Sequence, residues 1–257
     1  MREKETLLAG LQVLDLADEK ACFCSKLLAD LGARVIKVER PGGDPSRNIG
    51  PFWKDSPHPD RSLSFFYNNT NKLGITLDLD HEKGKKDFIR LVEESDVVVE
   101  TFSPGHLETL GLSFKTLSEI NPGIILTSVT GFGQNGPRKD YKSCDLVAAA
   151  FGGQMYVSGS PSTFPLKIFG EQSYYIASLN AAIGILLALQ NRRRGGGKGE
   201  HIDISLQEPV AAVILKKGVQ MPIPLIPQEL CFMPLSCRLS FIRISFSSSL
   251  RTLPISL

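Results

Sequence analysis

Short apolar runs alternate with helix-length segments over the first two hundred residues of the chain. Apolar strands are expected at residues 11–16, 35–39, 75–79, 96–100 and 123–129. Side chains at helical spacing predict helices near residues 23–31, 88–92, 117–120, 146–152 and 174–190. Gly32 is expected to end the first of these helices.

This alternation predicts the fold class. Nearly continuous Val, Ile and Leu strands separated by helices are typical of a parallel sheet that is covered on both faces. We therefore expect a doubly wound α/β domain. In such sheets ligands bind beyond the carboxyl ends of the strands, so the segments that follow each strand are the places to search.

The longest apolar helix, near residues 174–190, precedes the basic run 192–194 and could resemble a membrane span. Ser178 and Asn180 interrupt it, and its apolar run is shorter than the roughly 20 residues that a bilayer requires. We expect a buried core helix and no membrane association.

Composition narrows the expected partners, the location and the metal content of the protein. The 257 residues are 42% apolar and 22% charged, and the net charge of +2 gives no field that would favour nucleic acid. The N-terminus carries both charge signs and no apolar run, so no secretory signal is expected and the cytoplasm is the expected location. Five cysteines without CxxC spacing predict reduced thiols and no metal site.

The character of the chain changes after residue 217. The last forty residues mix proline, serine and leucine without a sustained period. Three interpretations stay open: a poorly ordered tail, part of a second domain, or a segment translated out of frame.

Residues 131–136 match the pattern GxGxxG and follow a predicted strand. A dinucleotide fingerprint needs its last glycine in the first turn of a helix, whereas here Pro137, Arg138 and Lys139 follow. The segment is interpreted as a loop.

Basic side chains recur near strand ends, and each one alone is typical of a solvated surface. Together they could hold the phosphates of an anionic ligand, because Arg and Lys make charge-assisted contacts with phosphate. The set comprises Lys37, Arg40, Arg47, Lys72 and Lys142.

Residues 10–52 resemble the opening of the family III CoA-transferases, which include formyl-CoA and crotonobetainyl-CoA:carnitine transferases and an acyl-CoA racemase. The likeness continues in order through NKLGITLDL, DVVVETFSPGHLETLGL, NPGIILTSVTGFGQNGP, CDLVAAAFGG and AAIGILLALQNRRRGGGKGEHIDISLQE. It implies a Rossmann-like CoA-binding domain at residues 1–217 and an interlocked dimer. Residues 218–257 would then be an atypical tail or a remnant of the small domain, and the family's C-terminal half would be absent.

The resemblance also implies binding residues. Positions that match the CoA contacts of the family are Arg40, Lys72, Thr101, Phe102, Leu110 and Lys142. CoA would enter as an acyl-CoA substrate, and a carboxylic acid would accept it.

Catalysis in the family uses an aspartate near the start of the long helix. It forms a mixed anhydride and then an enzyme-bound thioester, which divides one transfer into easier steps. A gap-free count places that position at Tyr174, which cannot form an anhydride of this kind. The nearest acid, Glu171, could serve as nucleophile or could cap the helix, and capping is the slightly favoured interpretation.

The racemase activity would need a histidine at Cys144, before Asp145, and is not expected. The leading hypothesis is therefore a CoA-transferase that moves CoA between carboxylic acids. The alternative is a non-catalytic CoA-binding subunit, paired with a related chain, or a truncated relic of such an enzyme.

Overall fold

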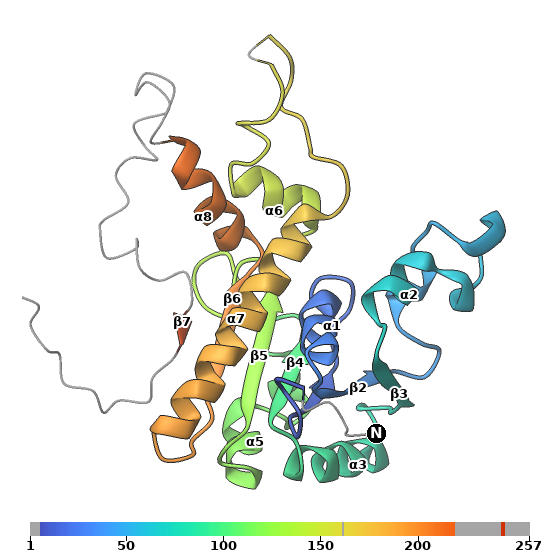
Figure 1. The fold of residues 1–257 in the computed structure, drawn as a ribbon, viewed down its shortest axis with the longest axis vertical. Coiled ribbons are helices and arrows are strands. Elements are labelled where there is room, and N and C mark those ends of the chain that lie inside the picture. The colour runs from blue at the N-terminus through green and yellow to red at the C-terminus, as the bar shows by residue number, and fades with distance from the viewer. Residues whose placement is uncertain (1–5, 161, 219–242, 245–257) are drawn as a thin grey trace, which may run out of the picture.

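The computed structural model describes residues 6–160, 162–218 and 243–244. Within them one sheet has the order β3-β2-β1-β4-β5-β6-β7 (Figure 1). The first six strands run parallel and β7 pairs antiparallel with β6. The strands are β1 (Gln12–Asp15), β2 (Arg34–Glu39), β3 (Lys72–Thr76), β4 (Val97–Glu100), β5 (Ile125–Thr130), β6 (His201–Ser205) and β7 (Arg243–Ile244).

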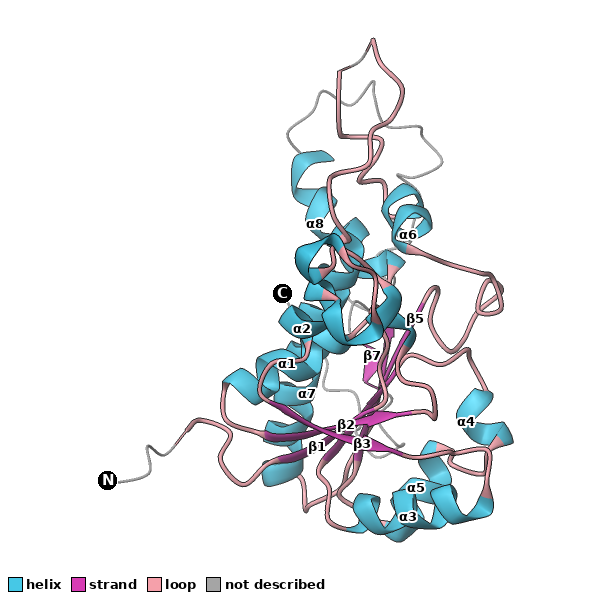
Figure 2. Cartoon of the chain, turned by 90° about the vertical axis from the view of Figure 1, so that its right-hand side faces the viewer, coloured by secondary structure: helices cyan, strands magenta, loops and turns pink. Residues whose placement is uncertain are grey.

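Helices cover both faces of the sheet, as predicted for a doubly wound fold (Figure 2). One face is covered by α1 (Cys22–Asp30) and α7 (Gln172–Arg194), and α6 (Asp145–Phe151) and α8 (Gln207–Gly218) pack on α7. The other face is covered by α3 (Glu82–Glu93), α4 (His106–Thr109) and α5 (Phe114–Ile120). The segment between β2 and β3 contains three short 3-10 turns, at Pro45–Asn48, Trp53–Asp55 and Pro59–Arg61, and then α2 (Leu63–Asn68).

Two apolar clusters explain why the strands are so apolar. In β4, Val97 and Val99 belong to the cluster beneath α1 and α7, while Val98 belongs to the cluster beneath α3 and α5. Successive side chains of a strand point to opposite faces, so a strand that is covered twice must be apolar at every position. The sequence pattern arises from this double burial.

The third strand differs from its expected position. Residues 75–79 were expected to form it, whereas β3 spans Lys72–Thr76. Its register with β2 pairs Val35 with Lys72 and Glu39 with Thr76, so the neighbouring strand sets both ends. Leu77 and Leu79 follow the strand and pack against the cluster beneath α3 and α5.

The long helix α7 is a core helix, as expected. Its small side chains Ala177, Ala181 and Ala188, together with Ile185, are buried against the sheet. By length and composition it is the one helix in the described part of the chain that could cross a membrane, and 56% of its apolar window is buried.

The predicted domain boundary at residue 217 falls in the last turn of α8 and stays a prediction. Most of the expected tail, including Cys231 and Cys237, lies outside the described residues. Cys22, Cys24 and Cys144 are free thiols.

Candidate functional site

The centre of the sheet provides the site's scaffold. From β1 the strand order runs outward to β2 and β3 on one side and to β4, β5 and β6 on the other. This is the point where α/β sheets open a crevice for ligands. The loop after β1 is held here, because Asp18 N donates to Thr101 Oγ1 at 2.9 Å and Leu16 N donates to Val99 O at 2.8 Å.

Asp15, the last residue of β1, is fully buried. Its carboxylate accepts hydrogen bonds from Lys72 Nζ at 2.8 Å and from Ser25 Oγ at 2.6 Å. Burial alone would raise the pKa of Asp15, but the charges of Lys72 and Lys37 outweigh it and hold the pKa below its usual value. Lys72 Nζ also bonds to Cys22 O and Asn69 Oδ1, each at 2.8 Å, so the ammonium group has three acceptors.

Two more basic residues from the sequence set form internal ion pairs instead of lying on a solvated surface. Lys37 is 2% exposed and lies 2.7 Å from Asp44. Arg47 binds Glu39 with both Nε and Nη2, at 2.6 and 2.7 Å. These pairs order the connection that follows β2.

Arg40 and Lys142 are exposed, in the segments that follow β2 and β5. Among the described residues neither has an ion pair. Of the three cations expected to contact CoA, these two therefore present charge to solvent, whereas Lys72 is buried.

The uncharged residues of the expected CoA set follow β4. Thr101 is buried and orients the β1 loop, as described above. Phe102 N donates to Glu100 Oε2 at 2.6 Å, and the ring of Phe102 packs on the apolar cluster beneath α3 and α5, as does Leu110. The three positions thus line one continuous segment that runs from the end of β4 to the end of α4.

The GxGxxG segment is a loop, as interpreted from the sequence. Gly133 has a φ of +85°, a conformation that favours glycine, and the next amide, Gln134 N, donates to both oxygens of Asp203 at 3.0 and 2.9 Å. The segment is thereby attached to β6, and no helix begins at its last glycine.

The start of α7 holds the position where the family's nucleophile is expected. Tyr174 is 7% exposed, and its hydroxyl accepts a hydrogen bond from Asp145 N at 3.1 Å. Glu171 is the N-cap residue of α7, as the slightly favoured capping interpretation requires, but its side chain makes no capping hydrogen bond. Ser173 N donates instead to Asp145 Oδ1 at 2.8 Å. A stabilising effect of the Glu171 charge on the helix start stays a prediction.

The Glu171 carboxylate is half-buried. Burial, followed by the negative charge of Asp145, raises the pKa of Glu171, while Lys167 lowers it. Lys167 Nζ lies 2.8 Å from Asp145 Oδ2, so the α6–α7 connection is attached to the same carboxylate.

Glu19 lies in the loop after β1, where the resemblance to the family implies an active-site polar residue. Its Oε2 is buried without a hydrogen-bond partner among the described residues, and burial raises the pKa of this carboxyl group. Glu19 also contributes to the raised pKa of Tyr174, after burial, so the two side chains are electrostatic neighbours.

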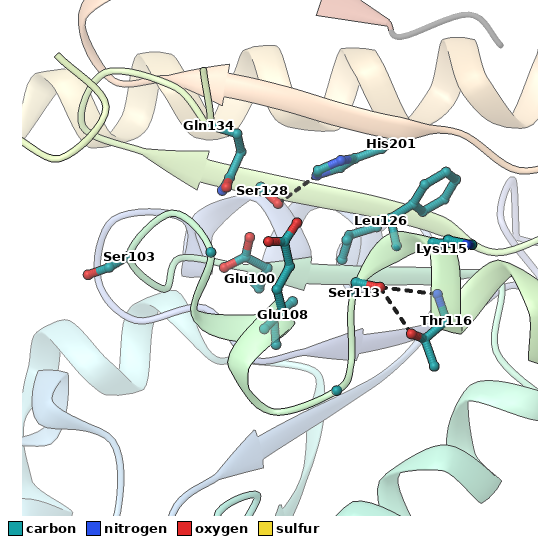
Figure 3. Close-up of a pocket in the computed structure, with 14 residues that line it drawn as sticks. Glu100, Ser103, Glu108, Ser113, Lys115, Thr116, Leu126, Ser128, Gln134 and His201 are labelled. Carbon is teal, nitrogen blue, oxygen red and sulfur yellow. Dashed lines mark hydrogen bonds between the residues drawn. The ribbon is translucent and has the colours of Figure 1, made fainter. Parts of the chain in front are cut away.

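A pocket of about 410 Å³ opens on the α4 and α5 face of the sheet (Figure 3). Glu100 is 2% exposed at its base, and burial raises the pKa of Glu100 to about 7. Ser128 Oγ lies 2.9 Å from His201 Nε2, and burial lowers the pKa of His201 to about 4. The pocket combines carboxyl, hydroxyl and imidazole groups.

Within residues 6–160, 162–218 and 243–244, no group of three or more His, Cys, Asp and Glu side chains could hold a metal ion.

The fold is that of an α/β protein in which six parallel strands carry connecting loops at their carboxyl ends. More specifically, the chain belongs to the CoA-transferase family III, whose family model matches residues 8–225.

Similar proteins of known name include the succinyl-CoA:(R)-benzylsuccinate CoA-transferase subunit BbsE of Thauera aromatica. It is 37% identical over 203 residues, which cover 79% of this chain and 49% of that protein. The succinyl-CoA–L-malate CoA-transferase beta subunit of Chloroflexus aurantiacus is 40% identical over 207 residues, covering 79% and 50%. The chain thus spans about half the length of these relatives.

Among solved structures, a CAIB/BAIF family protein from Brucella suis matches with a TM-score of 0.78 and 37% identity. The match covers 84% of this chain and 57% of that one. The expected family and fold are thereby confirmed.

Proposed function

We propose that the chain binds coenzyme A and takes part in moving CoA between carboxylic acids through an acyl intermediate bound to the protein. Its membership of the CoA-transferase family III carries this proposal. The names of two relatives, both CoA-transferase subunits that use succinyl-CoA, support the same reaction class. The acyl donor is an acyl-CoA and the acceptor a carboxylic acid.

In this proposal Arg40 and Lys142 bind the phosphates of CoA. Both are exposed cations beyond the ends of parallel strands, where charge-assisted contacts with phosphate can form. Thr101, Phe102 and Leu110 provide the surface along which the rest of the molecule lies. Lys72 acts indirectly in this proposal. Its ammonium group already has three acceptors, so it holds the end of β1 and the start of α1 in place instead of binding phosphate.

Calorimetric titration with free CoA tests the binding proposal. Arg40→Ala and Lys142→Ala should each weaken binding about tenfold, because each loses one charge-assisted contact worth roughly 1.5 kcal/mol. Lys86→Ala, which removes an exposed charge from α3, should bind CoA like the parent chain. A folded parent chain without saturable binding would rule out the proposal, and equal affinity of all variants would remove both cations from the site.

The proposed nucleophile is Glu171. Its carboxylate would attack the thioester carbonyl, break the C–S bond and release CoA thiolate, leaving a mixed anhydride. CoA thiolate would then attack the Glu171 carbonyl and release the donor acid. The acceptor carboxylate would attack this thioester, and the returning CoA thiolate would free Glu171 and form the new acyl-CoA. Each bond that breaks is matched by one that forms, and no other reactant is needed.

Mass spectrometry after mixing with succinyl-CoA tests this role. We expect a CoA adduct on the peptide that contains Glu171, and its loss in Glu171→Gln, since an amide cannot form the anhydride. Glu208→Gln, at the start of α8, serves as the matched control. Full transfer activity in Glu171→Gln would exclude this residue as the nucleophile.

A second candidate function is a non-catalytic CoA-binding subunit that pairs with an active relative. Tyr174 favours it, because this buried side chain occupies the position expected for the family's nucleophile. CoA binding without an adduct in the parent chain, together with transfer activity only after addition of a second subunit, would support this candidate. Turnover by the chain alone would exclude it.

We also propose that the chain acts in the cytoplasm and as part of a dimer, either with itself or with a related subunit. The subunit names of the two relatives support a partner of the same family.

A further inference from the structure

The first turn of α7 is capped by a side chain from α6, not by the residue that precedes the helix. A helix begins with N–H groups that have no acceptor within the helix, and the side chain at the N-cap normally accepts one of them. Glu171 holds that position without making the bond. Asp145 Oδ1, at the start of α6, accepts from Ser173 N at 2.8 Å instead.

Four contacts fix Asp145 in this role. Besides the bond from Ser173 N, Asp145 Oδ2 pairs with Lys167 at 2.8 Å. Asp145 N donates to the Tyr174 hydroxyl at 3.1 Å, and Ser173 Oγ donates to Asp145 O at 3.2 Å. Asp145 is 6% exposed, so water offers little competition for these contacts.

The consequence falls on Glu171, the residue that would otherwise cap the helix. Asp145 accepts the hydrogen bond instead, and the Glu171 side chain makes no capping hydrogen bond to the helix end. The titratable groups that face it are Asp145, Lys167, Tyr174 and Tyr175. After burial, the negative charge of Asp145 raises the pKa of Glu171, so Asp145 also acts on the protonation of this side chain.

We infer that Asp145 is a positioning residue: it occupies the cap of α7 and thereby leaves the Glu171 carboxylate free to attack an acyl-CoA. This inference rests on the proposed function of Glu171. It assigns to Asp145 no contact with the substrate.

Two variants separate the cap from the charge. Asp145→Asn keeps an oxygen acceptor for Ser173 N and removes the negative charge. Asp145→Ala removes both, so that Glu171 becomes the nearest acceptor for the helix end. Asp140→Asn, an exposed change five residues earlier, is the control for a general effect of charge.

The first measurement is a carbon-13 NMR titration of the Glu171 carboxyl group, assigned with Glu171→Gln, which requires no transfer activity. We expect the Glu171 pKa to fall in Asp145→Asn, since a like charge has gone, and to fall further in Asp145→Ala, where the carboxylate would accept a hydrogen bond. Asp140→Asn should titrate like the parent chain. An unchanged Glu171 pKa in Asp145→Asn would overturn the inference even if Asp145→Ala did not fold.

The second measurement is the rate of CoA adduct formation from succinyl-CoA. Asp145→Ala should be slower by about tenfold or more because its nucleophile is turned into the helix cap, and Asp145→Asn should recover part of that loss. The acid limb of the pH profile should move to lower pH in Asp145→Asn. An adduct that forms in Asp145→Ala at the parental rate would also overturn the inference.

The two proposals fail separately. A parent chain that binds CoA but forms no adduct would defeat the catalytic role of Glu171, while the NMR shifts would still show whether Asp145 controls this side chain. An adduct on Glu171 that is insensitive to both Asp145 variants would leave the proposed function intact and remove Asp145 from it.

Discussion

The Asp15 carboxylate ends the central strand with no exposed surface, and the Lys72 side chain beside it is 1% exposed. Charges are costly to bury, and such a pair persists because each partner compensates the other. Removal of Lys72 leaves the Asp15 carboxylate without its ion pair and offset only by the charge of Lys37. This poorly compensated charge would lie at the switch point of the sheet.

Lys72→Ala should therefore lower the free energy of unfolding by roughly 3 kcal/mol or more. Arg90→Ala, which breaks the exposed pair with Asp87 on α3, should cost about 0.5 kcal/mol. Urea unfolding of both variants measures the difference. Equal losses in the two variants would show that the buried pair contributes no more than an exposed one.

The same pair makes stability depend on acid. The folded pKa of Asp15 is depressed, so its contribution is complete above the ordinary carboxyl pKa and is lost as the pH falls through the lower folded value.

At the scale of elements, the end of β4 carries a buried carboxyl group whose pKa is raised, whereas the pKa of Asp15 at the end of β1 is lowered. Glu100 follows three buried valines and is itself buried against the pocket. Burial, the largest influence, raises its pKa from 4.5 to about 7. The folded state therefore holds this proton at pH values where the unfolded chain releases it, and stability falls as the pH rises from 4.5 to about 7.

Glu100→Gln should be more stable than the parent chain at pH 8, by about 3 kcal/mol, because the amide needs no ionisation. The difference should nearly vanish at pH 4, where both side chains are neutral. Thermal or urea unfolding of the two proteins across this range checks the prediction. An advantage of the same size at both pH values would assign it to packing instead of to the proton.

At the scale of the whole molecule, α7 buries one face and leaves another apolar face exposed. The exposed side chains recur at helical spacing, which places them on one stripe. They are Leu179, Ile183, Leu186 and Leu187, between 38% and 50% exposed. Contiguous apolar surface of this kind is typical of an interface, and it supports the proposed association with a second subunit.

The double variant Ile183→Glu with Leu187→Glu should weaken association of the chain with itself or with a related subunit, because it places charges on the apolar stripe. Sedimentation velocity over a range of concentrations measures this effect. Leu63→Glu, on α2, changes an equally apolar exposed position elsewhere and should leave association unchanged. Identical sedimentation of all three proteins would exclude the α7 stripe as the interface.

Local patterns of apolar residues predicted most of the strands and helices. Strands β1, β2, β4 and β5 and helices α1, α3, α5, α6 and α7 lie at or near their expected places, because double burial imposes a run of apolar residues and single burial imposes helical spacing. Strand β6, with its polar residues His201, Asp203 and Ser205 on one face, carries no such run and was not predicted from its pattern.

By itself the sequence determined the fold class and the family, since both depend on short segments in a fixed order. Only the tertiary structure decided which basic side chains are free of internal ion pairs and can contact a ligand. Lys37, Lys72 and Arg47 look like Arg40 and Lys142 along the chain, yet the first three reach carboxylates that the sheet brings beside them. The cap of α7 was decided in the same way, because Asp145 and Ser173 are 28 residues apart and meet only when α6 packs on α7.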